Sequence, residues 1–295
     1  MNMPTRHGVL AATPNIVRTA SGADLFYRDW GSGRPVVFLA SWSMPSESWS
    51  YQMLALVDAG YRAIAFDRRG HGRSSDPGRG YDFDTLADDV AAVLEALDLR
   101  DAILVGHSMG CNEIVRYLCR HGSARVGGAV MLATMTPFLR KTEDNPEGID
   151  GGVFDAIRRE QLMADFPRWI DDNMGPFVLP ETAQSMRDWV RFMAHGASLQ
   201  ALCECQRALA ETDFRAELPR IEVPVLVIAG ALDASAPPGL TAHPTVRLLP
   251  SATLKLYEDA PHGMFITHRA RVERDLLEFI QGVGHNRDQP DQEAR

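Results

Sequence analysis

Short apolar runs alternate with amphipathic segments through the first half of the chain. The runs that predict strands are residues 23–30, 36–39, 61–66, 102–105 and 128–133. The segments with helical spacing that lie between them are residues 49–59, 83–97 and 111–121. Strands that alternate with helices of this length indicate βαβ units. We therefore predict an α/β fold with a mostly parallel sheet, covered by helices on both faces.

The pattern changes over residues 135–217, where helical spacing replaces the strand signal. Met186, Trp189, Val190 and Met193 fall at positions i, i+3, i+4 and i+7, which places them on one face of a helix. This segment is therefore expected to be a helical insertion.

Buried-strand patterns return at residues 223–228 and 253–257, and a last helical pattern covers residues 270–281. The end of the chain is rich in Asn, Asp, Gln, Arg and Gly, which favours disorder. The predicted parts are an α/β core at residues 15–134 and 218–281, a helical cap at residues 135–217 and a disordered tail at residues 282–295.

The charge balance excludes some classes of partner. The 295 residues include 30 Lys and Arg against 39 Asp and Glu, a formal net charge of −9. An acidic chain lacks the positive surface that attracts nucleic-acid phosphates or anionic lipids. No apolar run reaches the roughly 18 residues of a membrane span. We therefore expect neither a nucleic-acid partner nor insertion into a membrane.

The N-terminus and the cysteines indicate a location in the cell. The apolar run at residues 8–12 is too short for the core of a signal peptide. The 4 cysteines are too few for a disulfide framework in a chain of this size. Both features favour a cytoplasmic protein with reduced thiols. The oligomeric state is left open, a homo-oligomer included.

The candidate chemistry is concentrated in Gly106-His107-Ser108-Met109-Gly110, between a predicted strand and a predicted helix. The pattern G-x-S-x-G in this context is typical of a nucleophile elbow, a sharp turn that exposes the serine hydroxyl. The backbone N–H of Met109 would then be one donor of an oxyanion hole. We therefore predict that Ser108 is the nucleophile.

A serine nucleophile needs a base, and the base needs a partner that fixes its tautomer. Asp233 and His262 each follow a predicted strand of the second half of the chain, at the sheet edge where sites of parallel sheets gather. The chain order Ser, Asp, His is that of the α/β hydrolases. We predict that His262 is the base and that Asp233 orients it. A turn-initiating aspartate and a surface-loop histidine are the alternative interpretations.

The remaining candidate side chains are interpreted as structural. His71 and His107 are expected to point away from the nucleophile, and Asp259 is expected to anchor a loop. Cys203 and Cys205 are two positions apart on a helix and cannot face one ligand together. Because no His, Cys or carboxylate pattern has metal-ligand spacing, we predict no metal and no cofactor.

Further motifs support a family resemblance. They are YRDWGSG at residues 27–33, DRRGHGRS at 67–74, YDFDT at 81–85, RHGSARV at 120–126 and DAPHG at 259–263. The shared stretches are spread from about residue 29 to residue 281, which is nearly the whole chain. The chain thereby resembles the α/β-hydrolase superfamily, and within it the bacterial arylesterases and the cofactor-free haloperoxidases and perhydrolases.

The resemblance implies an α/β-hydrolase fold with a helical cap. It also implies that the backbone N–H of Trp42 is the second oxyanion donor. The family carries His-Gly before this tryptophan, whereas this chain carries Ala40 and Ser41. The loss of a glycine restricts the conformations open to the loop. Whether the oxyanion hole is preformed is therefore a question for the structure.

The substrate pocket is predicted from the resemblance and from residue size. The expected contact residues are Trp42, Ser43, Phe138, Ser235, Ala236 and Met264. Ser235 and Ala236 are small where the family often carries bulky aliphatic residues, which favours a roomy pocket. The aromatic and methionine residues of the cap favour an apolar substrate over a charged one.

These observations predict a serine hydrolase that cleaves carboxylic esters or lactones through an acyl-enzyme. Perhydrolysis is the expected side activity when hydrogen peroxide replaces water. Dehalogenases and epoxide hydrolases of this fold resemble the chain less, because they carry Asp where Ser108 stands. A non-catalytic protein that binds a small molecule on the same scaffold is the alternative, because the family pattern is altered at Ala40 and Ser41.

Overall fold

The computed structural model describes residues 15–285. Within this range the chain forms an eight-stranded sheet with the order β1-β2-β4-β3-β5-β6-β7-β8. β2 pairs antiparallel with β1 and β4, whereas all other neighbours are parallel. The strands are β1 (Ile16–Arg18), β2 (Asp24–Gly31), β3 (Pro35–Leu39), β4 (Arg62–Phe66), β5 (Ala102–His107), β6 (Val126–Leu132), β7 (Val225–Gly230) and β8 (Ala252–Tyr257).

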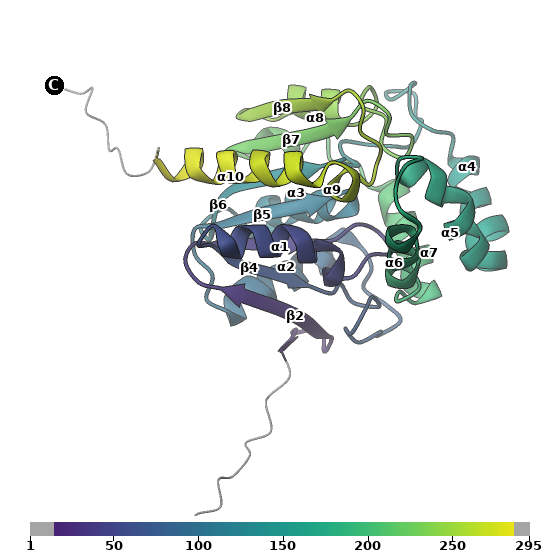
Figure 1. Ribbon diagram of the computed structural model, residues 1–295. Coiled ribbons are helices and arrows are strands. Elements are labelled where there is room, and N and C mark those ends of the chain that lie inside the picture. The colour runs from purple at the N-terminus through teal and green to yellow at the C-terminus, as the bar shows by residue number, and fades with distance from the viewer. Residues whose placement is uncertain (1–14, 286–295) are drawn as a thin grey trace, which may run out of the picture.

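Alternate residues of the central strands pack into two separate apolar cores. On β3, Val36 and Phe38 belong to one core, and Val37 and Leu39 belong to the other. Both sides of a parallel strand are buried in this way because helices cover both faces of the sheet. Figure 1 shows α1 (Ser50–Asp58) and α10 (Arg269–His285) on one face, with α2 (Phe83–Ala96) and α3 (Met109–His121) on the other.

The chain adds no strand to the sheet between β6 and β7. Helices occupy that stretch and gather beyond one end of the sheet (Figure 1). They are α4 (Gly151–Ala156), the π-helix η2 (Ile157–Leu162), α5 (Met163–Phe177), α6 (Gln184–Ala194) and α7 (Leu199–Glu211). The helix predicted from the spacing of Met186 and Met193 corresponds to α6, on which Val190 and Met193 are buried.

Each predicted strand has a counterpart in the sheet, although the boundaries differ. The strand expected at residues 102–105 continues to His107, because Gly106 and His107 pair with Met131 and Leu132 of β6. The short elements η1 (Ser46–Trp49), β1, η3 (Leu218–Arg220), α8 (Ala242–Leu248) and α9 (Met264–Thr267) were not predicted.

The expectation of disorder from residue 282 is wrong for the first four residues of the tail. Helix α10 continues to His285, and Val283 is buried in the same core as Leu276 and Ile280. The apolar spacing thus continues for one more turn. The rest of the tail and residues 1–14, on which the expectation about a signal peptide depends, lie outside the described residues.

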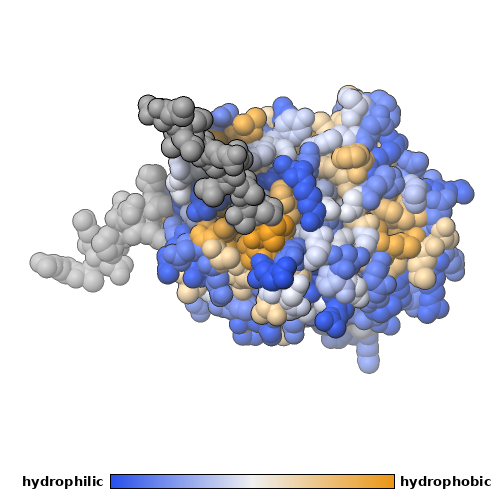
Figure 2. Space-filling view, turned by 90° about the horizontal axis from the view of Figure 1, so that it is seen from below, coloured by the Kyte–Doolittle hydropathy of each residue, from blue (hydrophilic) through white to orange (hydrophobic). Residues whose placement is uncertain are grey.

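The described part of the chain contains no helix that is long and apolar enough to cross a membrane. Figure 2 shows that hydrophilic residues cover most of one face of the molecule, with smaller apolar patches between them. The formal net charge of −9 is consistent with such a surface.

Candidate active site

Ser108 lies on a strained turn between β5 and α3. Its backbone angles are φ 55° and ψ −117°, a conformation that is rare for a residue with a side chain. Strain of this kind persists only where the surrounding structure enforces it, and it is a feature of nucleophile elbows. Ser108 is buried from bulk solvent but lines a cavity.

The two flanking glycines permit the close backbone packing that this turn requires. A Cβ at Gly106 would lie 2.7 Å from the backbone nitrogen of Cys111, and one at Gly110 would lie 2.4 Å from the carbonyl oxygen of Leu39. Any side chain at either position would therefore push α3 away from the sheet. The G-x-S-x-G pattern is thus a packing requirement as well as a turn signal.

Asp233 and His262 form a buried hydrogen-bonded pair. The Nδ1 atom of His262 lies 2.8 Å from Oδ2 of Asp233, and the exposed fractions of the two side chains are 6% and 1%. The other carboxylate oxygen of Asp233 accepts hydrogen bonds from the backbone N–H groups of Ser235 and Ala236, at 2.9 and 2.7 Å. The acid is thereby held in one orientation by its own loop.

The electrostatics keep Asp233 ionised. Burial alone would raise its pKa, but the charge and hydrogen bond of His262 and the amide of Ala236 outweigh burial and hold the pKa below its ordinary value. An ionised carboxylate can only accept, so Nδ1 of His262 is the donor in this pair. The Nε2 atom is then the unprotonated nitrogen of the neutral ring, and His262 lines the same cavity as Ser108.

His107 supports the loop that carries His262, a role that the sequence did not predict. Its Nε2 atom donates to the carbonyl oxygen of His262 at 2.9 Å, and the two rings lie 4.8 Å apart. Burial, together with the nearby charge of His262, lowers the pKa of His107 to about 3. His107 is therefore neutral, and it positions the backbone of the His262 loop rather than taking part in proton transfer.

The two residues predicted to supply the oxyanion donors lie next to Ser108 in the chain and in the wall of its cavity, respectively. Met109 is the first residue of α3, and its N–H is one of the first-turn donors that have no partner inside a helix. Trp42 lies in the loop after β3 and lines the cavity together with Ser108. Arg68 contacts this loop: it donates to the carbonyl oxygens of Ala40 and Ser41 at 2.6 and 3.1 Å.

The side chain of Trp42 connects this loop to the helices above it. Its Nε1 atom donates to the carbonyl oxygen of Leu202 on α7 at 2.9 Å. Its ring packs edge-on against Trp169 of α5, with centroids 5.0 Å apart. The loop after β3 is thus fixed from the core by Arg68 and from the helical segment by α5 and α7.

The cavity has a volume of about 350 Å³ and a mostly apolar wall. The described residues that line it include no Asp, Glu, Lys or Arg, and His262 is its one imidazole. The polar groups Asn173 and Gln206 already donate to backbone carbonyls of Trp169 and Phe154. Such a wall favours an uncharged ligand, because a charged group would lose its hydration without gaining a partner.

Three of the predicted substrate-contact residues line the cavity, namely Trp42, Ser43 and Ser235. The other three lie elsewhere. Phe138 is buried beneath the guanidinium of Arg215. Ala236 is buried and contributes its amide to Asp233. Met264 is buried in the core, where it begins α9.

The other singled-out side chains lie away from the cavity. His71 is fully buried, and its Nδ1 lies 3.0 Å from the carbonyl oxygen of Arg69. Asp259 is exposed and pairs with His268 at 3.2 Å rather than with His262. Cys203 and Cys205 are both buried. No group of three or more His, Cys, Asp or Glu side chains within residues 15–285 could hold a metal ion.

Comparison with known proteins finds relatives along most of the chain. The family model described as alpha/beta hydrolase fold matches residues 34–269. A non-heme chloroperoxidase from Streptomyces lividans is 43% identical over 274 residues, which cover 90% of this chain and 99% of the relative. A bifunctional esterase/perhydrolase from Acinetobacter calcoaceticus is 37% identical with the same coverage of both chains.

Solved structures share the fold. An esterase from Exiguobacterium antarcticum is similar with a TM-score of 0.88 at 28% identity, over 91% of this chain and 100% of that chain. A bromoperoxidase from Bacillus anthracis is similar with a TM-score of 0.86 at 33% identity and the same coverage. The chain therefore belongs to the α/β-hydrolase fold family.

Proposed function

We propose that this protein is a serine hydrolase that cleaves uncharged carboxylic esters through an acyl-enzyme on Ser108. The observation that carries the proposal is the buried hydrogen bond between His262 and Asp233, in a cavity that the strained Ser108 also lines. These groups correspond to the nucleophile, base and orienting acid of a catalytic triad.

Each group has one chemical task. Nε2 of His262 takes the proton of the Ser108 hydroxyl as the oxygen attacks the ester carbonyl, and it returns that proton to the leaving alcohol. Asp233 stabilises the imidazolium that forms in between. The amides of Met109 and Trp42 stabilise the negative oxygen of the tetrahedral intermediate.

The second half of the reaction releases the acid. Water, deprotonated by His262, attacks the acyl carbonyl, and Ser108 leaves as the alcohol and regains a proton. Hydrogen peroxide in place of water would yield a peracid by the same steps. A relative carries the name bifunctional esterase/perhydrolase, which supports this side activity.

The substrate class follows from the cavity. Its apolar wall suits an alkyl or aryl group on a neutral ester or lactone. We assign residues 135–217 as a cap, because α5, α6 and α7 contribute much of that wall, as with Trp169, Val190 and Gln206. The ligand-binding alternative is not favoured, because named relatives are enzymes and because His262, hydrogen-bonded to Asp233, lines the same cavity as Ser108.

Two further assignments accompany the proposal. The four cysteines are free thiols in the structure, which supports a reducing compartment such as the cytoplasm. A homo-oligomer stays a prediction.

The test is a series of p-nitrophenyl esters of increasing acyl length, run beside a panel of lactones. We expect turnover of neutral esters, and a loss on the order of 10⁴-fold or more in Ser108→Ala, because no other group can form the acyl-enzyme. An organophosphonate should label the wild type once, at Ser108. An alanine variant with wild-type rates, or a wild type with neither turnover nor label, would contradict the proposal.

A further inference from the structure

Arg68 makes three contacts around the loop that follows β3. Its two terminal nitrogens donate to the carbonyl oxygens of Ala40, at 2.6 Å, and of Ser41, at 3.1 Å. Its Nε atom donates to the carboxylate of Glu113. Arg68 and Glu113 are both buried, with exposed side-chain fractions of 3% and 2%. The guanidinium therefore uses a planar set of donors that a lysine does not possess.

These contacts determine where the N–H of Trp42 points. The peptide bond between Ser41 and Trp42 is trans, because the only cis peptide bond within residues 15–285 is Thr136-Pro137. In a trans peptide the carbonyl and the N–H point in opposite directions. Because the carbonyl of Ser41 points toward Arg68, the N–H of Trp42 points away from Arg68.

The residues that line the cavity agree with that direction. Ser41 and Trp42 both line the cavity, whereas Arg68 does not. The carbonyl of Ser41 also accepts from the N–H of Met44 at 3.2 Å, which closes a tight turn that includes Ser43 at φ 65°. The peptide plane is thus held by two donors on its carbonyl side.

Glu113 ties this loop to the nucleophile helix. It lies four residues after Met109 on α3, one helical turn farther along the same face. The helix that supplies one oxyanion donor through Met109 thereby also anchors the arginine that orients the other. This arrangement replaces the conformational freedom that a glycine would give at the position of Ser41.

We propose that Arg68, anchored by Glu113, is a positioning residue that aims the Trp42 amide into the oxyanion hole. The inference rests on the proposed function, because it assigns the support of that same site. It predicts that Arg68 acts on the transition state and contributes little to binding of the ground-state ester.

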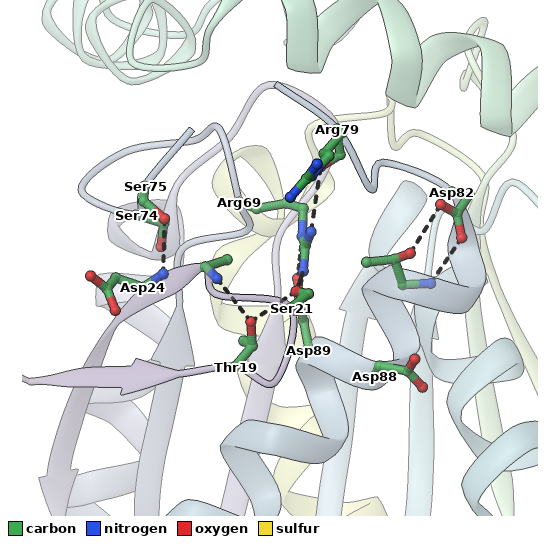
Figure 3. A network of polar contacts seen from close by, with 12 residues as sticks. Thr19, Ser21, Asp24, Arg69, Ser74, Ser75, Arg79, Asp82, Asp88 and Asp89 are labelled. Atoms are coloured by element: carbon green, nitrogen blue, oxygen red, sulfur yellow. Dashed lines mark hydrogen bonds and ion pairs between the residues drawn. The ribbon is translucent and has the colours of Figure 1, made fainter. Parts of the chain in front are cut away.

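Arg69 provides a matched control. It is the next residue, it is equally buried, and it forms an ion pair with Asp89 through two hydrogen bonds of 2.7 and 2.6 Å. Figure 3 shows that its guanidinium points toward Asp89 and Ser21. No hydrogen bond joins the Arg69 side chain to the loop at residues 40–44 in the described structure. Arg68→Lys and Arg69→Lys thus disturb similar buried ion pairs. Of the two arginines, only Arg68 is hydrogen-bonded to the loop at residues 40–44 in the described structure.

The experiment compares ester hydrolysis by both lysine variants, with active sites counted by phosphonate labelling. We expect Arg68→Lys to lower kcat by about 10- to 100-fold with KM within about threefold, since loss of one whole donor costs roughly 10²–10³ in rate. Arg69→Lys should keep kcat within about threefold. Affinity for an uncharged trifluoromethyl ketone, which adds to Ser108, should fall in parallel with kcat in Arg68→Lys only.

A second pair of variants guards against misfolding. Arg68→Met/Glu113→Leu and Arg69→Met/Asp89→Leu remove each ion pair without leaving a buried charge, a change that is often tolerated. The first double variant should show a turned peptide between Ser41 and Trp42 in its crystal structure, together with a lowered kcat. Equal kcat losses in the two pairs, or an unchanged peptide plane, would overturn the proposal. A wild type that neither turns over esters nor labels at Ser108 would instead overturn the proposed function, while the peptide plane would still test Arg68.

Discussion

The chemistry of the proposed site depends on which nitrogen of His262 carries a proton. Asp233 stays ionised, because its contacts with His262 and the amide of Ala236 lower its pKa against the effect of burial. The carboxylate therefore keeps the proton of the neutral ring on Nδ1, and Nε2 remains the basic atom. A proton on Nε2 would prevent His262 from accepting the proton of Ser108.

We therefore expect kcat/KM for a neutral ester to fall at acidic pH, because a general base must be unprotonated to accept the proton of Ser108. Asp233→Asn should lower kcat by about 10⁴-fold, because an amide can favour the wrong tautomer. Asp259→Asn is the control, since Asp259 is three residues before His262 but exposed and paired with His268. A rate that is constant down to pH 4, or equal losses in the two Asn variants, would contradict the role of His262 and Asp233.

At the scale of elements, helix α5 and the loop after β3 share one apolar contact. Trp169 of α5 lines the cavity and packs edge-on against Trp42, with centroids 5.0 Å apart. Trp189 of α6 packs instead against Tyr51, with centroids 5.7 Å apart, and does not line the cavity. One tryptophan of the cap thus limits the space for the substrate, and the other attaches the cap to α1.

Trp169→Ala should shift the preference toward longer or branched acyl groups. Removal of the indole leaves space in the wall for a larger acyl group. Each extra methylene that a hydrophobic pocket accommodates changes the ratio of kcat/KM between two substrates by about 10- to 200-fold at most. The measurement is the ratio of kcat/KM for long and short p-nitrophenyl esters. Trp189→Ala should leave that ratio within about threefold, and an equal shift in both variants would show that Trp169 does not form the acyl-binding wall.

At the scale of the whole molecule, two neutral histidines link folding to pH. Burial lowers the pKa of His71 and of His107 to about 3, from an ordinary value of 6.5. The folded state then binds fewer protons than the unfolded state below pH 6.5, so this contribution to stability is lost as the pH falls. Glu113 acts in the opposite direction, because burial raises its pKa to about 6. Its contribution to the free energy of unfolding is therefore lost as the pH rises through that value.

The histidines dominate, because there are two of them and their shifts are larger than that of Glu113. We expect the free energy of unfolding to fall by a few kcal/mol between pH 7 and pH 5, at about 1.4 kcal/mol per pKa unit and group. Urea denaturation at both pH values measures this difference. His71→Asn, which keeps a donor near the carbonyl of Arg69, should reduce it. A midpoint that stays constant or rises at pH 5 would contradict this account.

Features that depend on neighbouring residues could be predicted from the amino-acid sequence. Alternating apolar runs predicted the parallel strands, because side chains of one strand must fill two cores, as Val36 and Val37 do. The glycines around Ser108 predicted the sharp turn, because the backbone there leaves no space for a Cβ. Asp233 and His262 were predicted as partners because strands of a parallel sheet end at the same edge.

Features that depend on packing between distant segments could be recognised only in the folded protein. Arg68 reaches Ala40 and Glu113, and His107 reaches the backbone of His262, across separations of 28, 45 and 155 residues. Phe138 was expected in the pocket but packs beneath Arg215. An apolar side chain has the same sequence signature in a core as in a pocket wall, and a buried arginine has the same signature as a surface one. Which of these a residue becomes is determined by the order of the strands and by the position of the cap helices over the sheet edge, which no local pattern encodes.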